Sequence, residues 1–435
     1  MNLMEAQFPK VLVVSAAPIN RVDATGITMS NLFAGWPIDR IAQIYDSPIA
    51  PDPVYCAKSW RFSSNDIGSV RLAKSAAKRI RALRNPQGNS SGEEKNQPRN
   101  SSNDLGLLAV VGDVVPFKAP PALCEWAADF EPDIIYTLLG GSRICELVLQ
   151  LSKNLDKPIV PHFMDDWPST IYESHRFRKI FRSVMSRRLE GVLRRAPIGL
   201  AIGSGMAEVM SARYAKKFAY FMNCVECVRE GAIIKANTSN TVRFGYVGGL
   251  HLNRWRSLLA LAETIQLLAL SGTPISLEVC APVRDIELYG SKFSAFSSIL
   301  HLTSVSPDQV IDALISYDVL VHAESFLPED SRYTKLSVST KIPQYMASAR
   351  PILAIGPDDL SSIQYVEQSR AGLIVTEEGA NTGLAEAVHR LAQSKDLRDK
   401  LGQAGYSTAL EHHDASSERL RFASVLSCAA SHVIV

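Results

Sequence analysis

The sequence lacks the long apolar run that a membrane-spanning helix requires. No window of the 435 residues reaches that length, since crossing a bilayer takes roughly 18 to 20 apolar residues. Residues 1–15 also lack a basic stretch followed by a long apolar run, so they do not resemble a secretion signal. We therefore expect a cytoplasmic protein, which could still rest peripherally on the inner face of the membrane.

The chain is also poor in net charge and in paired cysteines. Its formal net charge of +2 gives no reason to expect nucleic acid as a partner, so any basic surface must be local. Cys224 and Cys227 have the spacing of a metal or redox pair, but no second pair completes a zinc site. We interpret the seven cysteines mainly as buried free thiols.

What the sequence does contain is an alternation of buried strands and helices that occurs twice. Continuous apolar runs such as residues 11–15 and 319–323 are typical of parallel strands covered on both faces. Helical stretches separate these runs, which predicts doubly wound parallel sheets. Because the chain is too long for one core, the expected fold class is α/β with two Rossmann-like domains.

Changes in composition divide the chain. A polar stretch at residues 234–241 separates an N-terminal domain, residues 1–235, from a C-terminal domain, residues 236–410. A last helix, residues 411–435, could pack back on the N-terminal domain. Residues 86–104 are rich in Asn, Ser, Gly and Pro, which predicts a disordered insert.

Two segments combine an apolar stripe with many basic residues. Residues 70–84 and 172–195 are both predicted to form basic amphipathic helices. Such helices are typical of proteins that rest on anionic lipid, and a solvated surface helix is the alternative. The stripe expected in the second helix consists of Phe177, Phe181, Val184, Met185, Leu189 and Val192.

The segment 337–351 has the features of an anion site. Ser339 or Thr340 can cap a short helix, and Pro343 suits its first turn. Free amides at the start of this helix, with flanking hydroxyls and Lys341, are suited to bind phosphate. An ordinary loop–helix–strand connection is the alternative.

Further candidates follow other predicted strands of the C-terminal domain. Gly248 and Gly249 let the backbone approach a ligand closely, and Arg254 or Arg256 follows in the next helix. Glu324 ends another strand, at the edge where open parallel sheets bind ligands.

The N-terminal domain offers two more sites. Gly26 lies where a helix would begin and its amides could face a phosphate, although the sequence has no GxGxxG fingerprint. His162 and Asp165 lie with Asp166 and Trp167 at the carboxyl end of a predicted strand. They favour a general base or a carboxylate that orients an acceptor, and helix capping by either aspartate is the alternative.

Several of these motifs, taken in order, resemble the GT-B glycosyltransferases. They are YVGGL before an arginine-bearing helix, DVLVHAES, and STKIPQYMASARPILA. The nearest branch is the retaining, family 4-like (group 1) enzymes of bacterial polysaccharide synthesis. The resemblance covers nearly the whole chain apart from the insert, and it implies two domains that face a cleft.

The resemblance also implies how the C-terminal domain would hold a nucleotide-sugar donor. Arg254 or Arg256, together with Lys341, would neutralise the donor diphosphate. Glu324 would contact the donor sugar, and the Gly26 loop would close over the diphosphate from the other domain.

On the acceptor side, the resemblance places Asp165 with His162 nearby. The donor phosphate itself would take the proton of the acceptor, a glycan or lipid-linked glycan, so no dedicated base is required. No DxD motif is present, and we expect neither a metal ion nor another cofactor.

The chain departs from the family pattern in three places. Gln344 stands where a glutamate commonly holds the nucleotide ribose, which puts the donor affinity in question. The residues LPEDSRYTKLSV between Glu324 and Gln344 are interpreted as an inserted loop. Ala349 stands where a glycine usually ends the helix.

These observations favour a membrane-peripheral glycosyltransferase. One alternative is a nucleotide-sugar epimerase of the same fold, which needs no acceptor. Another is a non-catalytic, glycosyltransferase-like partner subunit, suggested by Gln344.

Overall fold

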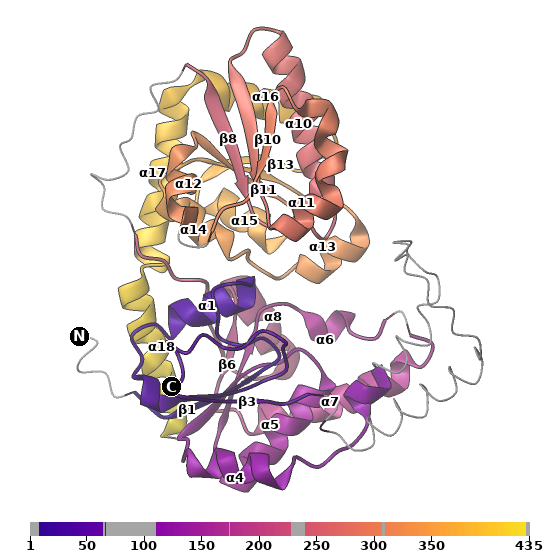
Figure 1. Cartoon of the computed structure of the whole chain (residues 1–435), viewed down its shortest axis with the longest axis vertical. Coiled ribbons are helices and arrows are strands. Elements are labelled where there is room, and N and C mark those ends of the chain that lie inside the picture. The colour runs from indigo at the N-terminus through magenta and orange to yellow at the C-terminus, as the bar shows by residue number, and fades with distance from the viewer. Residues whose placement is uncertain are drawn as a thin grey trace, which may run out of the picture.

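The computed structural model describes residues 8–63, 66, 110–173, 175–227, 240–306 and 309–431. Two α/β domains lie one above the other, each built around a parallel sheet (Figure 1). The predicted α/β fold class is therefore confirmed. The expected basic helix at residues 70–84 and the expected insert at residues 86–104 lie outside the described residues.

The N-terminal domain contains a seven-stranded sheet in which the order is β3-β2-β1-β4-β5-β6-β7. Its strands are β1 (Val11–Ser15), β2 (Ile41–Tyr45), β3 (Lys58–Arg61), β4 (Ile134–Leu138), β5 (Ile159–Phe163), β6 (Gly199–Ala201) and β7 (Phe218–Tyr220). The central strands β1 and β4 are parallel, with Val11 opposite Ile134. The strand order reverses between these two strands, and ligands of doubly wound sheets bind at such a reversal.

Helices cover both faces of this sheet. One face packs against α4 (Pro121–Asp129), α5 (Ser142–Leu155), α7 (Arg178–Arg194) and α8 (Ser204–Tyr214). The other face packs against α1 (Ala24–Leu32) and α18 (Ala415–Ala430). The short helices η2 (Ile38–Arg40) and α6 (Trp167–Thr170) lie in the connections.

The C-terminal domain repeats the plan with six strands in the order β10-β9-β8-β11-β12-β13. They are β8 (Val242–Val247), β9 (Ile275–Cys280), β10 (Leu300–Thr303), β11 (Val319–Ala323), β12 (Ile352–Ile355) and β13 (Gly372–Val375). Here the order reverses between β8 and β11, so the loops after these strands are the expected ligand edge.

Helices again pack on both faces. One face carries α10 (Arg254–Leu270), η4 (Gly290–Phe296) and α16 (Thr382–Gln393). The other carries α12 (Val310–Ser316), α14 (Lys341–Ala347), α15 (Ser361–Gln368) and α17 (Lys395–His412). The remaining helices are α11 (Val283–Tyr289) and α13 (Pro328–Thr334).

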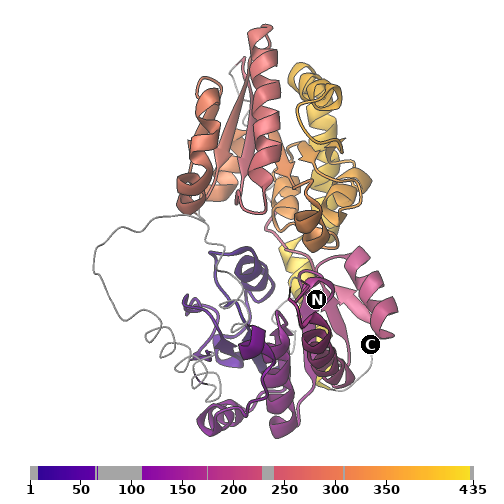
Figure 2. The same cartoon turned by 90° about the vertical axis from the view of Figure 1, so that its right-hand side faces the viewer.

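The last helix returns to the first domain. After α17 the chain crosses the junction, and α18 lies against the N-terminal sheet (Figures 1 and 2). The ring of Phe422 lies 5.1 Å from that of Phe33, 5.2 Å from that of Phe221 and 5.8 Å from that of Tyr136. The N-terminal domain is thus completed by the C-terminal end of the chain.

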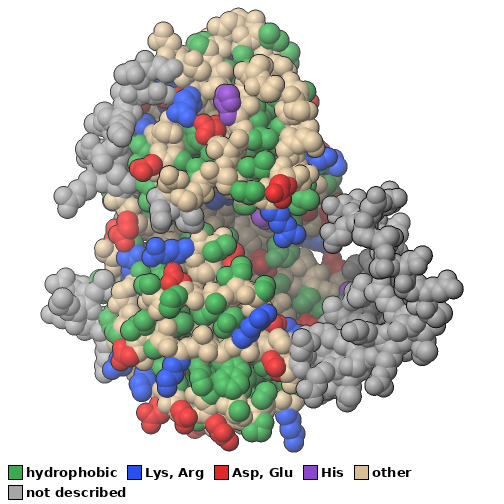
Figure 3. Space-filling view, viewed as in Figure 1, with side chains coloured by type: hydrophobic (Ala, Val, Ile, Leu, Met, Phe, Trp, Pro, Cys, Tyr) green, Lys and Arg blue, Asp and Glu red, His purple; other side chains and the backbone are tan. Residues whose placement is uncertain are grey.

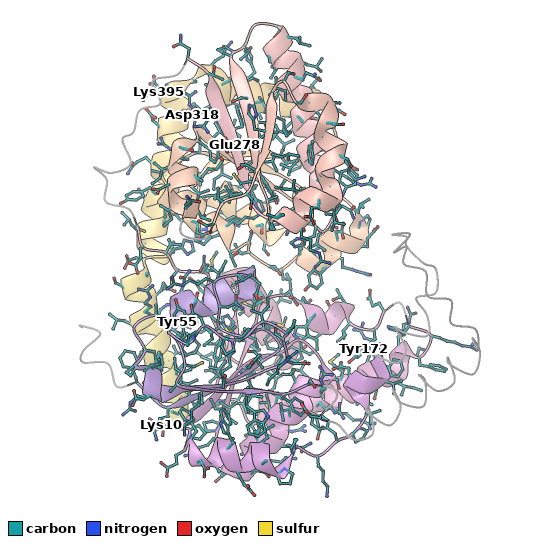
Figure 4. All side chains as sticks on the ribbon, viewed as in Figure 1. Lys10, Tyr55, Tyr172, Glu278, Asp318 and Lys395 are labelled. Atoms are coloured by element: carbon teal, nitrogen blue, oxygen red, sulfur yellow. The ribbon has the colours of Figure 1, made fainter. Side chains whose placement is uncertain are left out.

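The carboxyl ends of the two sheets face each other. Lys10 precedes β1 and Asp318 precedes β11, and these two residues lie on the far sides of their domains (Figure 4). The ligand edges of both sheets therefore point toward the junction, where the molecular surface is hollowed (Figure 3).

Two expectations about helices need correction. The helix expected from residue 172 begins at Arg178, and Phe177, expected on its buried stripe, is 48% exposed. The expected inserted loop LPEDSRYTKLSV contains α13, because Pro328 at the first position and Glu329 and Asp330 in the first turn favour a helix start. No helix in the described ranges is both long and apolar enough to span a membrane.

Candidate functional site

Glu324 is the buried centre of the candidate site. It directly follows β11, at the reversal of strand order, and is 2% exposed. The guanidinium of Arg254, at the first position of α10, donates from Nη2 to Oε2 at 3.1 Å and to Oε1 at 3.3 Å. Burial alone would raise the pKa of Glu324, but Arg254, His322 and Lys341 lower it to about 2. The carboxyl group is therefore ionised at neutral pH.

Lys341 reaches the same point from α14. Its Nζ lies 3.2 Å from the hydroxyl oxygen of Tyr246 and 4.5 Å from the centre of that ring. Burial, together with repulsion from Arg254, lowers the pKa of Lys341 to about 7, although Glu324 raises it. At neutral pH the amine is only partly charged, and a bound anion would restore its charge.

Two tyrosines fix the helix that carries this lysine. The hydroxyl of Tyr345, on α14, accepts from the amide of Val247 and donates to its carbonyl, both at 3.1 Å. The hydroxyl of Tyr246 donates to the carbonyl of Gly249 at 2.6 Å. The end of β8 and the start of α14 are thus held together around the lysine.

Gly248 makes this arrangement sterically feasible. Its φ is +156°, and a Cβ atom there would lie 2.5 Å from Nζ of Lys341 and 2.9 Å from its Cδ. The next loop residues are fixed by Asp285, which accepts from the amide of Leu250 at 2.6 Å. The backbone and the two basic side chains therefore converge beside Glu324.

Ser339, Thr340 and Gln344 lie next to Lys341 at the start of α14. Thr340 is the N-cap of α14 but makes no side-chain capping bond, while Ser339 donates its amide to Ser362 at 3.0 Å. Within the described part of the chain, the side chains of Ser339, Thr340 and Gln344 have no hydrogen bond. These polar groups are available to a ligand, and Gln344 is half-buried.

The structure shows which of the two candidate arginines, Arg254 or Arg256, belongs to the site. Arg256 is exposed, and its guanidinium carbon lies 5.2 Å from the centre of the Trp255 ring. It makes no contact with Glu324, whereas Arg254 does. Arg254 is therefore the arginine of the site.

The two aspartates after β5 have different surroundings. Asp165 lies at the junction, where its Oδ1 accepts from the amide of Trp167 at 3.0 Å and its Oδ2 accepts from the hydroxyl of Tyr333 at 2.9 Å. Asp166 is instead bound by both Nη atoms of Arg213, at 2.5 and 2.8 Å. Asp165 is thus the aspartate that is placed at the domain junction.

His162 does not reach the junction surface. It belongs to β5, is fully buried, and its Nδ1 lies 2.7 Å from the hydroxyl oxygen of Tyr136. Burial lowers its pKa to about 3, so the ring is neutral. Its position within the strand turns it into the core, where it cannot touch an acceptor.

Gly26 is also not a free helix terminus. The helix α1 begins at Ala24, and Asp23 caps it by accepting the amide of Gly26 at 2.8 Å. The amide of Gly26 itself is therefore already bonded to a carboxylate of the chain. Asp23 is a standard capping residue that stands three positions before the glycine.

Some residues of the site gave no signal in the sequence. Tyr246 ends up under Lys341 although 95 positions separate them. Asn223 donates its side-chain amide to the carbonyl of Thr340 at 3.0 Å and accepts from Asn31 at 2.8 Å. The first contact depends on packing within the C-terminal domain and the second on how the domains dock, and local sequence patterns encode neither.

Comparisons with known proteins extend this description. No family model matches the sequence, and no curated protein matches it. Solved structures do match: OtsA in its apo form has a TM-score of 0.59 at 11% identity, covering 96% of this chain and 99% of its own. The apo form of WaaB, a lipopolysaccharide outer core galactosyltransferase, has a TM-score of 0.56 at 13% identity, with 96% and 99% covered. The chain has a GT-B fold.

A third matching structure is that of a putative UDP-N-acetylglucosamine 2-epimerase from Listeria monocytogenes. Its TM-score is 0.52 at 12% identity, covering 97% of this chain and 96% of that one. Transferases and an epimerase therefore share this architecture. At such identities the likeness is one of fold, and the reaction must be argued from the site.

Among the described residues, no three His, Cys, Asp or Glu side chains gather where they could hold a metal ion. The basic side chains beside Glu324 are those of Arg254 and Lys341.

Proposed function

We propose that this protein is a glycosyltransferase that moves a sugar from a nucleotide sugar to a glycan or lipid-linked acceptor, with retention of the anomeric configuration. The convergence of Arg254, Lys341 and Gly248 beside Glu324 carries the proposal. Two basic side chains against an open stretch of backbone, at the ligand edge of a parallel sheet, suit a diphosphate.

The proposed reaction uses these groups to stabilise the leaving group. The acceptor oxygen bonds to the anomeric carbon while the bond from that carbon to the phosphate oxygen breaks. The bonding electrons leave with the nucleoside diphosphate, which also takes the proton of the acceptor hydroxyl. Arg254 and Lys341 offset the negative charge that grows on the diphosphate. Glu324 accepts hydrogen bonds from the donor sugar.

Gln344 has a defined role in this proposal. Its half-buried amide is close in sequence to Lys341 on α14 and has no hydrogen bond within the described ranges. An amide can bond two ribose hydroxyls, although without the charge of a carboxylate. A weak but real donor affinity is expected.

The test begins with nucleotide binding. A ligand that binds only the folded state raises the melting temperature, so we would measure the shift for a panel of nucleoside diphosphates. One nucleotide should give a shift that is lost in Lys341→Ala and in Arg254→Ala. Arg256→Ala is the matched control, because it removes an exposed arginine two positions away and should bind like the wild type.

The second step follows the sugar. Incubation of the corresponding nucleotide sugars with membrane-extracted acceptors should release nucleoside diphosphate and label the acceptor. Conversion of the nucleotide sugar without an acceptor would instead identify an epimerase. An absence of nucleotide binding that Gln344→Glu restores would identify a decayed, non-catalytic subunit.

The proposed reaction needs no metal ion, since basic side chains take the place of one at the diphosphate. We therefore expect turnover to be unchanged after treatment with a chelator and dialysis. Measuring nucleoside diphosphate release before and after the treatment checks this, with Mg²⁺ added back in a parallel sample. Loss of turnover that Mg²⁺ restores would contradict the metal-free mechanism.

We also propose a peripheral contact with anionic membrane at the start of α7. Phe177 and Ile180 are 48% and 62% exposed, and Arg176, Arg178 and Lys179 are exposed beside them. Large apolar side chains flanked by cations favour the headgroup boundary of a bilayer. This patch spans the start of α7, the second helix after the acceptor-side loop of Asp165, which suits a lipid-linked acceptor.

Cosedimentation with vesicles tests this contact. Wild-type protein should bind vesicles rich in anionic lipid, and the double change Phe177→Ser with Ile180→Ser should weaken binding several-fold. Leu270→Ser is the control, because that residue is 80% exposed on the other domain. Equal sedimentation of all three proteins would show that the patch does not bind lipid.

A further inference from the structure

The helix α13 connects the two sides of the candidate site. It begins four residues after Glu324 and contacts α6 of the N-terminal domain. The segment that follows it places Leu336 against the hydrophobic core of that domain. Part of the C-terminal domain therefore docks on the acceptor-side loop.

On its own domain, α13 is fixed to the donor loop. The carboxylate of Asp330 accepts from the side-chain amide of Asn253 at 2.9 Å. Asn253 and Leu252 both have positive φ values, +52° and +54°. Such values are unfavourable for residues other than glycine, so they indicate a constrained loop. This loop runs from Gly249 into Arg254, which binds Glu324.

Toward the other domain, α13 presents two side chains. Tyr333 donates its hydroxyl to Oδ2 of Asp165 at 2.9 Å, and Arg332 forms an ion pair with Glu173. The first contact meets the aspartate that the proposed function places at the acceptor. The second lies beside it and touches no residue of either substrate site.

We propose that Tyr333 is a positioning residue that orients the carboxylate of Asp165 toward the acceptor hydroxyl. The inference rests on the proposed function, because it assumes that Asp165 meets an acceptor.

The hydrogen-bonding capacity of the carboxylate supports this role. Oδ1 takes one bond from the amide of Trp167, and Oδ2 takes one from Tyr333. Each oxygen can accept a second bond. The two existing bonds fix the plane of the carboxylate, and the remaining lone pairs are free to receive an acceptor hydroxyl. Because the tyrosine comes from the donor domain, this orientation exists only when the two domains are docked.

The hydrogen bond from Tyr333 also affects the pKa of Asp165. Burial raises the pKa of Asp165, the bond from Tyr333 lowers it, and the neighbouring Asp166 raises it. Asp166 is itself paired with Arg213. Removing the tyrosine hydroxyl should therefore raise the pKa of Asp165 further, and an activity that needs the ionised carboxylate should fail at a higher pH on the acidic side.

The test compares Tyr333→Phe with Arg332→Gln in the full-length protein. Tyr333→Phe removes one hydroxyl and should lower kcat/KM for the acceptor about tenfold or more. The dissociation constant for the nucleoside diphosphate should stay within twofold of the wild-type value. The acidic limb of the rate profile should move to higher pH. Arg332→Gln breaks a neighbouring interdomain contact and should leave that limb in place.

The outcomes separate the two ideas. If the wild type turns over and Tyr333→Phe keeps its acceptor kcat/KM and pH profile, the positioning role is wrong while the proposed function stands. If both variants move the profile equally, the contacts only hold the domains together, which also overturns the role. If the wild type binds no nucleotide and transfers no sugar, the proposed function fails, and the inference fails with it.

Discussion

Lys341 is the residue whose charge depends most directly on a ligand. Its pKa of about 7 results from burial and from the nearby guanidinium of Arg254, with Glu324 opposing them. Tyr246 supplies only a hydroxyl oxygen and a ring face, which do not neutralise the charge. A diphosphate bound here would add negative charge and raise the pKa of the lysine.

The pH dependence of nucleotide binding follows from this shift. Below about pH 7 the lysine is already charged, so affinity is greatest there. As the pH rises through 7, the free protein loses the proton that the complex keeps, and affinity should fall by up to about tenfold per pH unit. Titration calorimetry from pH 6 to 9, in buffers of different ionisation heat, should show proton uptake above pH 7.

Lys341→Arg is the control for this prediction. Arginine stays charged throughout this range, so only the titration of the ligand itself should remain. An unchanged pH dependence in that variant would mean that another group takes up the proton.

Ala349 is a second residue with a local consequence. It ends α14 with a φ of +53°, where a residue without Cβ is favoured. Ala349→Gly should raise the free energy of unfolding by about 0.5 to 1 kcal/mol, because relief of the left-handed strain exceeds the added entropy of the unfolded chain. Urea unfolding measures the change, and a loss of stability would show that the alanine is not strained.

At the scale of elements, α17 supports α14 at very short range. A Cβ atom at Gly402 would lie 2.2 Å from the carbonyl oxygen of Ala349 and 2.9 Å from its carbonyl carbon. This Cβ atom would clash with backbone atoms, which cannot avoid it by a change of rotamer. The close packing of α17 therefore holds the helix that carries Lys341.

Gly402→Ala should separate these two helices. We expect a loss of about 1 to 3 kcal/mol in the free energy of unfolding, as for overpacked cores, and weaker nucleotide binding. Gly383→Ala is the matched control in α16, where the added Cβ would lie 3.4 Å from the nearest atom. That change should be neutral or stabilise by up to about 1 kcal/mol. Urea unfolding of both variants measures these free energies. An equal change in Gly402→Ala and Gly383→Ala would contradict the packing argument.

The elements could largely be predicted from the sequence, because their signals are local. The apolar runs at residues 11–15 and 319–323 are strands, and a helix does begin at Lys341, although its N-cap residue Thr340 makes no side-chain capping bond. The interpretation of the α13 segment as a loop is wrong, although the sequence shows the proline and the acidic first turn that favour a helix.

The site was less predictable, because its geometry depends on distant contacts. Nothing near Arg254 or Arg256 distinguishes the one that meets Glu324. His162 is of a residue type common in catalysis, but it lies inside a buried strand. Gly26 lies in the first turn of a helix, as its place in the sequence indicates, yet Asp23 caps that helix. The side on which a side chain emerges is decided by packing, which a single sequence does not display.

At the scale of the whole molecule, the chain crosses between the domains twice, and the crossings are bonded to each other. The amide of Val225 donates to the carbonyl of His413 at 2.9 Å, and the amide of Ala415 donates to the carbonyl of Val225 at 3.0 Å. Tyr365 holds the second crossing through a 2.7 Å bond between its hydroxyl and Nε2 of His413. The described start of the first crossing, at Val225, is therefore bonded to the second crossing.

The second crossing makes one helix critical for the other domain. Phe422 is fully buried among aromatic rings of the N-terminal core. Phe422→Ala should lower the free energy of unfolding by about 3 to 5 kcal/mol. The N-terminal domain should be the part that loses stability. Hydrogen exchange should show reduced protection in β1 and β4 with little change in β11.

Leu410→Ala provides the comparison, since that residue is 47% exposed on α17. It should leave exchange in both sheets nearly unchanged. A uniform loss of protection across β1, β4 and β11 in Phe422→Ala would instead show that the two domains unfold as one unit.

The packing of α18 on the N-terminal sheet also determines when each domain can be completed during translation. The N-terminal domain lacks the ring of Phe422 until the strands of the second domain have been translated, whereas those strands lie in one continuous stretch of sequence. At ordinary translation speeds, roughly 10 to 40 s separate synthesis of Phe221 from synthesis of Phe422. The N-terminal domain is thus completed only after the sheet of the second domain has been synthesised, and during that interval its exposed apolar face is open to aggregation.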